Sequence, residues 1–402
     1  METSINSLSE GRLQPAQFAE HLISCKREYS VTRVSYITGF SRVDLPVAIA
    51  YRPNSKVLSQ SGGKGVSKVQ ALISALMESY ECDAAEKIQP DTYSVSFEEL
   101  VDSSISALDP RTLPTTLTDY SSVSRIDWSE CYDLFSNETI MVPFDAISLD
   151  FTRMSDLGRK CFMQLTSNGL ASGQDVESAI ISALLEIIER HSVTTAEINN
   201  TSDAMEIDLT TLPSSISKQL LSKFDTASVS CKLFYVGIFS CLPVYSCLIV
   251  DNNGQGNVGW GCHTDDDIAA ARAITEANQA RTIQISGSRE DMHRYDYIMV
   301  HKINHDLPSA PENLTSYSDL KKQHFHPSEI SLRRLADIWD DLGLPNPLVK
   351  VLASDKYKAA VRVVVPLLHG YNYPAYRSVL RNNYTDQLSD YLSKVTHRPA
   401  AI

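Results

Sequence analysis

Two segments of the chain each carry a pair of glutamates three residues apart within a helical pattern. Glu78 and Glu81 lie in ALISALMESYE, and Glu186 and Glu189 lie in AIISALLEIIE. Residues three apart share one face of a helix, and like charges this close repel each other unless a cation lies between them. Mg²⁺ usually binds a few carboxylates together with substrate phosphates. The pairs therefore predict magnesium-dependent phosphate chemistry.

A third segment repeats the pattern. Glu186 follows Glu78 by 108 positions and Glu276 follows it by 198, with Gln279 in place of the second glutamate. Each copy comes after a glycine-bearing segment, and Gly65 and Gly173 fall in the same register. We interpret the three copies as an internally repeated glycine-loop-plus-helix unit.

Each of these helix faces has a simpler interpretation, namely a solvated surface. Solvated faces usually carry mixed charges, often with opposite signs four residues apart. Here the glutamates share their face with small residues such as Ala71, Ser74 and Ala179, and apolar residues occupy the opposite side. The combination favours a face that lines a site.

Cationic residues accompany the acidic ones. Lys64 lies in SGGKG just before the first helix, where backbone N–H groups favour anions. Arg190 directly follows Glu189, and Arg272 precedes Glu276 by one turn. The GxxxxGK[ST] spacing of a Walker A loop is missing. Together these residues predict a cage for a nucleoside triphosphate, in which Mg²⁺ and cations offset the phosphate charge.

Other motifs are weaker. The GxGxxG match at 254–259 is not followed at once by a helix, so we interpret it as a turn and not as a dinucleotide site. Cys262 and His263 are adjacent, but adjacency alone does not make a nucleophile–base pair. Four histidines have pairwise spacing that a metal could use, and we interpret them as surface residues: His301, His305, His324 and His326.

The elements that must position these residues alternate in type. Strands are expected across 31–61, 232–250 and 360–366, and helices at 68–86, within 166–198 and at 265–285. A polar, proline-containing stretch at 306–330 is expected to be a surface loop. We predict α+β (α/β layered) architecture, with residues 1–30 as an N-terminal arm holding one short helix and 31–402 as a single domain.

Composition sets the outer limits. The chain has 402 residues, 43% of them hydrophobic, and a formal net charge of −13. The apolar content excludes general disorder, and the charge argues against coating of duplex nucleic acid, although it leaves room for a basic pocket. The longest apolar stretch is too short for a bilayer and the N-terminus is polar. The eight cysteines never form CxxC. We expect a cytoplasmic protein with no membrane or nucleic-acid partner.

The three segments in order resemble the YcaO family. The resemblance rests on SGGKG with ALISALMESYE, on 166–173 leading into EIIER, and on RAITEANQAR followed by SGSRED, and it extends from about residue 31 to 380. It implies a YcaO-like fold with repeated units around a central nucleotide site that binds ATP and Mg²⁺. The implied reaction activates a peptide-backbone amide: a nucleophile adds to the carbon, the oxygen takes a phosphoryl group, and phosphate leaves.

The resemblance also assigns residues. The implied metal ligands are Glu78, Glu81, Glu186, Glu189 and Glu276. The implied nucleotide contacts are Lys64, Ser67, Gln174, Arg190, Arg272, Gln279 and Arg281. Among all of these, Glu78, Glu189, Arg190 and Arg272 are expected to act in catalysis. Family members often have Gly and an acidic residue after the late strand's proline, where this chain has Leu-Leu-His369-Gly.

The subtype follows from segments outside the three motifs. VTRV, Gly39, DLPV and YRP, all before Lys64, are similar to the thioamide-forming branch associated with TfuA. The proline-rich tail typical of azoline-forming members is missing. The expected partners are a substrate or precursor peptide and a TfuA-like sulfur-delivery protein or an E1-like, leader-binding protein, and a homodimer is compatible with the sequence. The alternatives are an azoline-forming cyclodehydratase and a nucleotide-binding regulatory scaffold without catalysis.

Overall fold

The computed structural model describes residues 12–114, 120–155, 163, 165–198, 204–251, 254, 256–291, 314–321 and 330–370. Residue contacts group them into two compact units, neither of which is continuous in sequence. The first unit contains the described parts of 81–199 and 330–402, and the second contains those of 12–80 and 200–329. The single domain expected over 31–402 stays a prediction.

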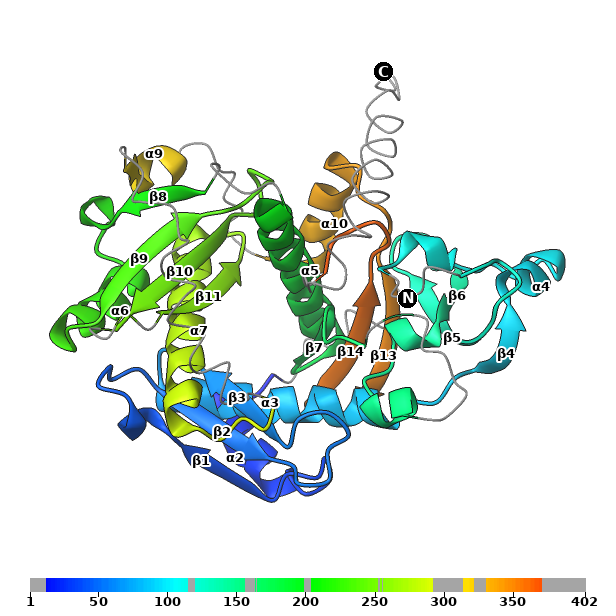
Figure 1. Ribbon diagram of the computed structural model, residues 1–402, viewed down its shortest axis with the longest axis horizontal. Helices are drawn as coiled ribbons and strands as arrows, with labels where there is room; N and C mark the ends of the chain where they lie inside the picture. The colour runs from blue at the N-terminus through cyan, green and yellow to red at the C-terminus, as the bar shows by residue number, and fades with distance from the viewer. Residues whose placement is uncertain are drawn as a thin grey trace. The chain divides into compact units, whose positions relative to one another are not determined.

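The first unit is built on one antiparallel sheet. Its strand order is β4-β5-β13-β14-β7, and β6 pairs with β5. The strands are β4 Thr92–Ser96, β5 Arg125–Asp133, β6 Thr139–Pro143, β7 Leu170–Gly173, β13 Leu348–Ser354 and β14 Ala359–Val364. Its helices are α4 Phe97–Asp102, α5 Val176–Ile198 and α10 Leu332–Asp341, and its 3-10 turns are η2 Pro110–Thr112, η3 Phe144–Ala146 and η4 Phe151–Ser155. Helix α5 packs on β7 and β14, as Figure 1 shows.

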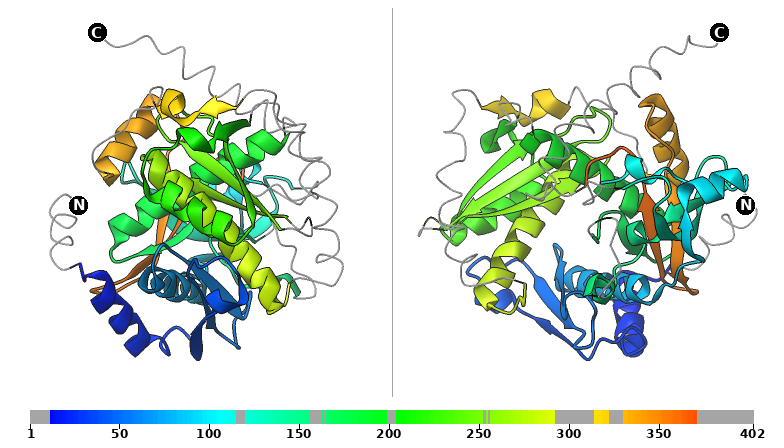
Figure 2. Two further views of the ribbon diagram at one scale, coloured as in Figure 1. Left: turned by 90° about the vertical axis from the view of Figure 1, so that its left-hand side faces the viewer. Right: turned by 45° about the vertical axis from the view of Figure 1, so that its right-hand side comes forward.

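The second unit contains two sheets. The smaller has the order β1-β2-β3, and the larger has the order β11-β10-β9-β8-β12. Their strands are β1 Arg33–Tyr36, β2 Val47–Tyr51, β3 Gln60–Lys64, β8 Met205–Asp208, β9 Ser230–Tyr235, β10 Val244–Val250, β11 Gly256–Cys262 and β12 Thr315–Ser316. The other elements are α2 Pro15–Cys25, α6 Ile216–Thr226, α7 Asp266–Ser286, α9 Tyr317–Lys321, η1 Thr38–Phe40 and η5 Leu209–Thr211. Helices α6 and α7 cover one face of the larger sheet (Figure 2), and α7 also contacts β3.

Helix α3, Lys68–Lys87, belongs to both units. Its residues up to Tyr80 are grouped with the second unit, and those from Glu81 onward are grouped with the first. Residues 71–86 include none that is fully exposed. The wheel predicted from the sequence, with an apolar side and an acidic side, therefore lies on a helix that is covered all round.

The repeated unit is a strand followed by a capped helix. Strands β3, β7 and β11 precede α3, α5 and α7 directly. Ser67 accepts a hydrogen bond from the Gln70 N–H, Asp175 from the Ser178 N–H at 2.8 Å, and Asp265 from the Asp267 N–H at 2.8 Å. Each cap satisfies a backbone donor that the first helical turn leaves open.

The repeated unit differs in part from the predicted glycine loop followed by a helix, because Gly62, Gly63 and Gly173 belong to strands β3 and β7, whereas Gly65 lies between β3 and α3. A Cβ on Gly63 would come within 2.7 Å of the Ala75 Cβ, and one on Gly261 within 2.6 Å of the Ala273 N. The glycines therefore let each helix lie directly against the strand backbone. The small residues predicted on the helix faces partly serve this contact, since Ala71 and Ala75 are fully buried against β3.

Two further expectations need correction. Within the stretch expected to be a surface loop at 306–330, residues 315–321 form β12 and α9, whose Tyr317 and Leu320 are buried in the core of the second unit. Within the GxGxxG match, Gly254 lies in a turn, with φ of +80°, whereas 256–259 belong to strand β11. The next helix begins only at Asp266, after the match has ended, whereas in a dinucleotide-binding fingerprint the glycines lead directly into the helix.

Several expectations lie outside the described residues: 1–11 of the N-terminal arm, the four histidines at 301–326 and the C-terminal tail. The short helix expected in the arm is confirmed as α2. No helix among the described residues is long and apolar enough to cross a bilayer.

A buried histidine pair joins α5 to the segment after β14. The His191 and His369 ring centroids are 5.2 Å apart, and the His369 backbone N–H donates to His191 Nδ1 at 3.0 Å. The Thr194 hydroxyl donates to the Gly370 carbonyl at 2.5 Å. Burial lowers the pKa of His191 to about 3 and that of His369 to about 4. Both rings are therefore neutral at pH 7.

This pair predicts acid sensitivity. An unfolded chain protonates both histidines near their ordinary pKa, whereas the folded chain resists protonation, so the free energy of unfolding falls as pH drops below about 6.5. His191→Asn keeps an acceptor near the Nδ1 position but cannot titrate. We expect it to reduce the stability loss between pH 7 and pH 5 by about 2 kcal/mol, measured by urea unfolding at both pH values. An unchanged loss would contradict the assigned pKa direction.

Candidate active site

Three of the predicted metal ligands lie in the first unit. Glu81 accepts a hydrogen bond from the Ser172 hydroxyl at 2.7 Å, and Glu186 accepts one from the Gly169 N–H at 3.3 Å. Both donors come from β7 or the segment leading into it. Glu189, one turn beyond Glu186 on α5, is only 3% exposed. The strand of the repeated unit thus orients carboxylates of α3 and α5.

A buried arginine accompanies these acids. Arg362, on β14, is 2% exposed, and its Nε and Nη2 donate to the carbonyls of Ala146 and Thr166 at 2.8 and 2.6 Å. Burial lowers the pKa of Arg362 to about 10, whereas the charges of Glu186 and Glu81 act to raise it. The guanidinium therefore stays charged at pH 7 and lies within electrostatic range of two predicted metal ligands. The sequence signal for it was a lone charge within the β-branched run AVRVVV.

The remaining first-unit candidates are half-buried. Arg190 Nη2 lies 4.0 Å from Glu189 Oε1, at the outer limit of an ion pair. Gln174 lies between β7 and the Asp175 cap of α5. That place is close to the helix N-terminus, where backbone N–H groups favour an anion.

In the second unit, Lys64 and Glu276 form an ion pair. Lys64 is the last residue of β3 and Glu276 lies on α7, and their side chains are 24% and 19% exposed. The other oxygen of Glu276 lies 3.5 Å from the Trp260 N. Two sequence-predicted residues separated by 212 positions are therefore brought into direct contact.

Arg272 lies one turn before Glu276 on α7. Its Nε is buried and has no hydrogen-bond partner among the described residues. Burial, and then the charge of Arg272, lowers the pKa of His263, and His263 Nδ1 accepts the Asp265 N–H at 3.0 Å. His263 is therefore a neutral neighbour of this arginine. An unsatisfied guanidinium donor of this kind suits an acceptor such as a phosphate oxygen.

Three weaker candidates have evident structural roles. Ser67 is exposed and caps α3. Gln279 packs over Gly62, where a Cβ would meet its Nε2. Arg281 binds Asp251 through Nε and Nη2, at 3.0 and 2.7 Å, and donates from Nη1 to Ser41 at 2.6 Å. Because all three nitrogens of Arg281 have partners, its guanidinium is the least available for phosphate.

The segment SGSRED contacts the beginning of β3. The Ser59 hydroxyl donates to Glu290 at 3.0 Å, and the Ser288 hydroxyl donates to Gln60 at 2.9 Å. The segment thus fixes the strand that carries Lys64.

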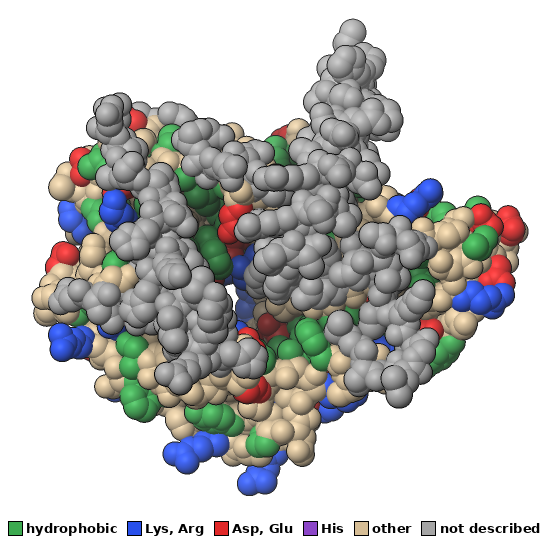
Figure 3. Space-filling view, in the orientation of Figure 1, with side chains coloured by type: hydrophobic (Ala, Val, Ile, Leu, Met, Phe, Trp, Pro, Cys, Tyr) green, Lys and Arg blue, Asp and Glu red, His purple; other side chains and the backbone are tan. Residues whose placement is uncertain are grey.

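The predicted acids do not lie on solvated faces. Glu189 is buried, and Glu78, Glu81, Glu186 and Glu276 are all intermediate in exposure. Among the residues that Figure 3 colours, the charged side chains on the face in view occur in small separate groups. The carboxylates are thus largely covered by protein.

The donor set fits Mg²⁺ and phosphate. Among the described residues, no group of three or more His, Cys, Asp or Glu side chains could hold a metal alone. A magnesium ion does not require one, because it commonly binds one or two carboxylates and completes its shell with phosphate oxygens and water. The unsatisfied Nε of Arg272 provides a matching donor for such oxygens. These features are typical of a magnesium- and nucleotide-dependent enzyme that has no Walker loop.

The chain belongs to the YcaO family. The family model, described as YcaO cyclodehydratase, ATP- and Mg²⁺-binding, matches residues 62–369. This confirms the predicted family, the layered fold and the cofactors ATP and Mg²⁺, and it identifies an ATP-dependent peptide-modifying enzyme.

Two relatives match most of this chain. An uncharacterized protein of Methanothermobacter thermautotrophicus is 32% identical over 354 residues, covering 84% of this chain and 89% of the relative. An uncharacterized protein in the tfuA 3′ region of Rhizobium leguminosarum bv. trifolii is 28% identical, covering 71% and 70%.

Solved structures agree on the fold. YcaO from Methanopyrus kandleri, bound with AMPPCP and Mg²⁺, superposes with a TM-score of 0.68 at 19% identity, covering 91% of this chain and 98% of that one. A heterocyclase in complex with substrate and cofactor gives 0.69 at 18% identity, covering 92% and 55%.

Proposed function

We propose that this enzyme converts a peptide-backbone amide into a thioamide, with ATP as the phosphoryl donor and a sulfur nucleophile as co-substrate. The supporting observation is the relative encoded in a tfuA 3′ region, which matches 71% of this chain. The segments VTRV, DLPV and YRP, which are similar to the TfuA-associated branch, point the same way.

A hydrosulfide or an equivalent sulfur donor adds to the amide carbon, and the amide oxygen becomes an oxyanion. That oxyanion takes the γ-phosphoryl group of ATP, so its bond to phosphorus forms as the bond to ADP breaks. The carbon–oxygen bond then breaks, phosphate leaves, and carbon–sulfur double bonding is completed with loss of the sulfur proton. One ATP is consumed for each thioamide.

The acidic residues of the chain would bind the metal ion, and the basic residues would bind phosphate. Glu78, Glu81, Glu186, Glu189 and Glu276 would hold Mg²⁺, which when bound offsets the phosphate charge. Lys64, Arg190 and Arg272 would bind phosphate oxygens and stabilise the charge that develops during transfer. Gln174 and Gln279 would contact the nucleotide, and Ser67 and Arg281 would support the helix ends nearby.

The Lys64–Glu276 ion pair of the second unit joins a proposed phosphate-binding cation to a proposed metal-binding carboxylate. An ammonium that binds phosphate must leave or share its carboxylate partner, and the released carboxylate could then bind metal. Nucleotide and Mg²⁺ would therefore replace one contact with two, which predicts that each ligand strengthens binding of the other.

We further propose two protein-level partners: the substrate peptide and a TfuA-like protein that delivers sulfur. The direct test combines this chain, ATP, Mg²⁺, a candidate peptide and sulfide, with and without the TfuA-like protein. Mass spectrometry of the peptide should find one oxygen replaced by one sulfur, with phosphate released in equal amount. Phosphate release without any peptide modification, across partners and peptides, would contradict the proposal.

The second candidate is azoline formation, in which a neighbouring Cys, Ser or Thr side chain is the nucleophile. It is favoured by the cyclodehydratase description of the family and by the similarity to a heterocyclase. The same experiment separates the two, because an azoline forms by loss of one water and needs no added sulfide.

A further inference from the structure

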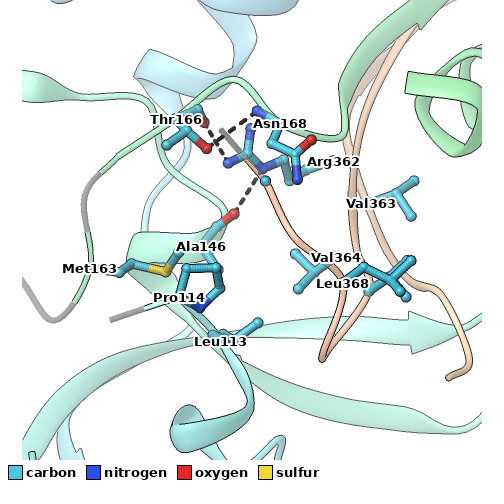
Figure 4. Close-up of a pocket in the computed structure, with 12 residues that line it drawn as sticks. Leu113, Pro114, Ala146, Met163, Thr166, Asn168, Arg362, Val363, Val364 and Leu368 are labelled. Carbon is cyan, nitrogen blue, oxygen red and sulfur yellow. Dashed lines mark hydrogen bonds between the residues drawn. The ribbon is translucent and has the colours of Figure 1, made fainter. Parts of the chain in front are cut away.

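The first unit contains a pocket beside its carboxylates. Leu113, Pro114, Val364 and Leu368 form its apolar walls, and Arg362 and Asn168 lie together at its other end (Figure 4). Leu113, Val364 and Leu368 are each less than 9% exposed. The walls come from the segment after η2 and from β14 and its following turn, so the surroundings are largely preformed by the sheet.

The pocket is small. Including its mouth it encloses about 540 Å³, but the volume open to the centres of water molecules is only about 50 Å³. One water needs about 10–15 Å³ by the same measure. A space of this size suits one aliphatic side chain.

The polar end of the pocket has unused hydrogen-bonding capacity. Arg362 Nη1 and Asn168 Oδ1 are buried and have no partner among the described residues. The other two nitrogens of Arg362 are held by backbone carbonyls, so Nη1 is fixed in place. A donor that is held in place and an acceptor at the same end of the pocket match the C=O and N–H of a peptide, and leaving them unmet is costly.

The position of the pocket ties it to the reaction site. Asn168 directly precedes Gly169, whose N–H binds Glu186, and Arg362 lies within electrostatic range of Glu186 and Glu81. A peptide residue held here would lie close to the predicted metal ligands of this unit.

We propose that this pocket binds an internal aliphatic residue of the substrate peptide. The side chain of that residue lies between the apolar walls. The carbonyl of the same residue accepts a hydrogen bond from Arg362 Nη1, and its N–H donates one to Asn168 Oδ1. The peptide nature of the occupant rests on the proposed function, but the binding itself is independent of catalysis. The pocket therefore makes the enzyme selective for a residue such as Leu near the modified amide.

Binding of blocked amino acids to the full chain tests this without any turnover. We expect N-acetyl-leucinamide to bind with a Kd of about 1 mM and N-acetylglycinamide to bind at least about tenfold more weakly, because the side chain contributes most of the apolar contact. Saturation-transfer NMR titrations of both probes measure the ratio. Equal binding of the two amides overturns the proposal, as does binding of N-acetyl-leucine without the amide, since a terminal carboxylate would then be the occupant.

Two variants and a matched control locate the binding. Leu368→Phe fills the pocket, and Asn168→Ala removes the acceptor from a partly exposed position. Each should weaken N-acetyl-leucinamide at least about tenfold. Val351→Phe makes a similar enlargement at an exposed residue of β13 and should leave binding unchanged. If Leu368→Phe does not fold, as judged by its melting curve, Asn168→Ala decides, and unchanged binding in that variant overturns the proposal.

Failure of the pocket and failure of the reaction give different results. A chain that forms thioamides but binds both amides equally refutes the pocket alone. A chain that binds N-acetyl-leucinamide selectively but never modifies a peptide refutes the proposed function and retains the pocket.

Discussion

Glu189→Gln is expected to reduce ATP consumption by about 10³-fold or more, and Glu78→Gln by a similar factor. Glutamine keeps the size of the side chain but removes the negative charge that would hold Mg²⁺. Glu189 is 3% exposed on α5, so water cannot easily substitute for the lost charge. Phosphate release with peptide and partner present is the measurement.

The matched control is Glu197→Gln, the same change on the same helix at an exposed position. It should retain the parental rate. Both active-site variants should keep the parental melting temperature to within a few degrees, since glutamine keeps the size and shape of the glutamate side chain. Parental turnover in Glu78→Gln and Glu189→Gln would remove these residues from the site.

Gly63→Ala is expected to destabilise the chain by more than about 3 kcal/mol, enough to prevent recovery of folded protein in a marginally stable domain. The added methyl group would lie within 2.7 Å of the Ala75 Cβ and even closer to the backbone of α3. Backbone atoms cannot move aside as a flexible side chain can. Urea or thermal unfolding measures the loss.

Gly39→Ala provides the comparison within the same unit. Gly39 lies in η1, and a Cβ there would have no heavy atom within 4 Å. Its stability should change by no more than about 0.5 kcal/mol. Equal effects of the two substitutions would show that the strand–helix contact at Gly63 does not limit stability.

The long periodic elements were predictable from the sequence. The helix expected at 68–86 is α3, Lys68–Lys87, and the one expected at 265–285 is α7, Asp266–Ser286. Both are long runs without Gly or Pro, and both carry the repeated Glu pattern, which together indicate helices. The strand at 360–366 was equally clear from its β-branched residues, and it is β14.

The glycine segments were misread because glycine has two opposite uses. It permits flexible turns, and it also permits close approach of another backbone. Nothing local in SGGK distinguishes them; the partner, Ala75 of the following helix, does so only after folding. The prediction of a surface loop at 315–321 was wrong for another reason, because α9 has too few residues to show a helical period in the sequence.

The site was predictable in its residue types and only partly in its contacts. Repetition of the Glu pattern singled out five carboxylates that are all at least partly buried. The Lys64–Glu276 pair depends on β3 and α7 meeting, which no sequence spacing encodes. Arg362 was passed over because a buried strand was expected to be uniformly apolar, and its two carbonyl partners become visible only in the folded unit.

The glycine contacts between strand and helix also bear on how such a chain can change over generations. Because Gly63 is pressed against α3 and Gly261 against α7, the rotation of each helix about its own axis is set by that contact and not by the linker before it. The linkers at 65–67 and 263–265 could then gain or lose residues without changing the direction in which Glu78 or Glu276 points. A single added carbon at Gly63 or Gly261, by contrast, could not be accommodated. Insertions should therefore accumulate in the linkers of related chains, and the strand glycines should be the last positions to drift.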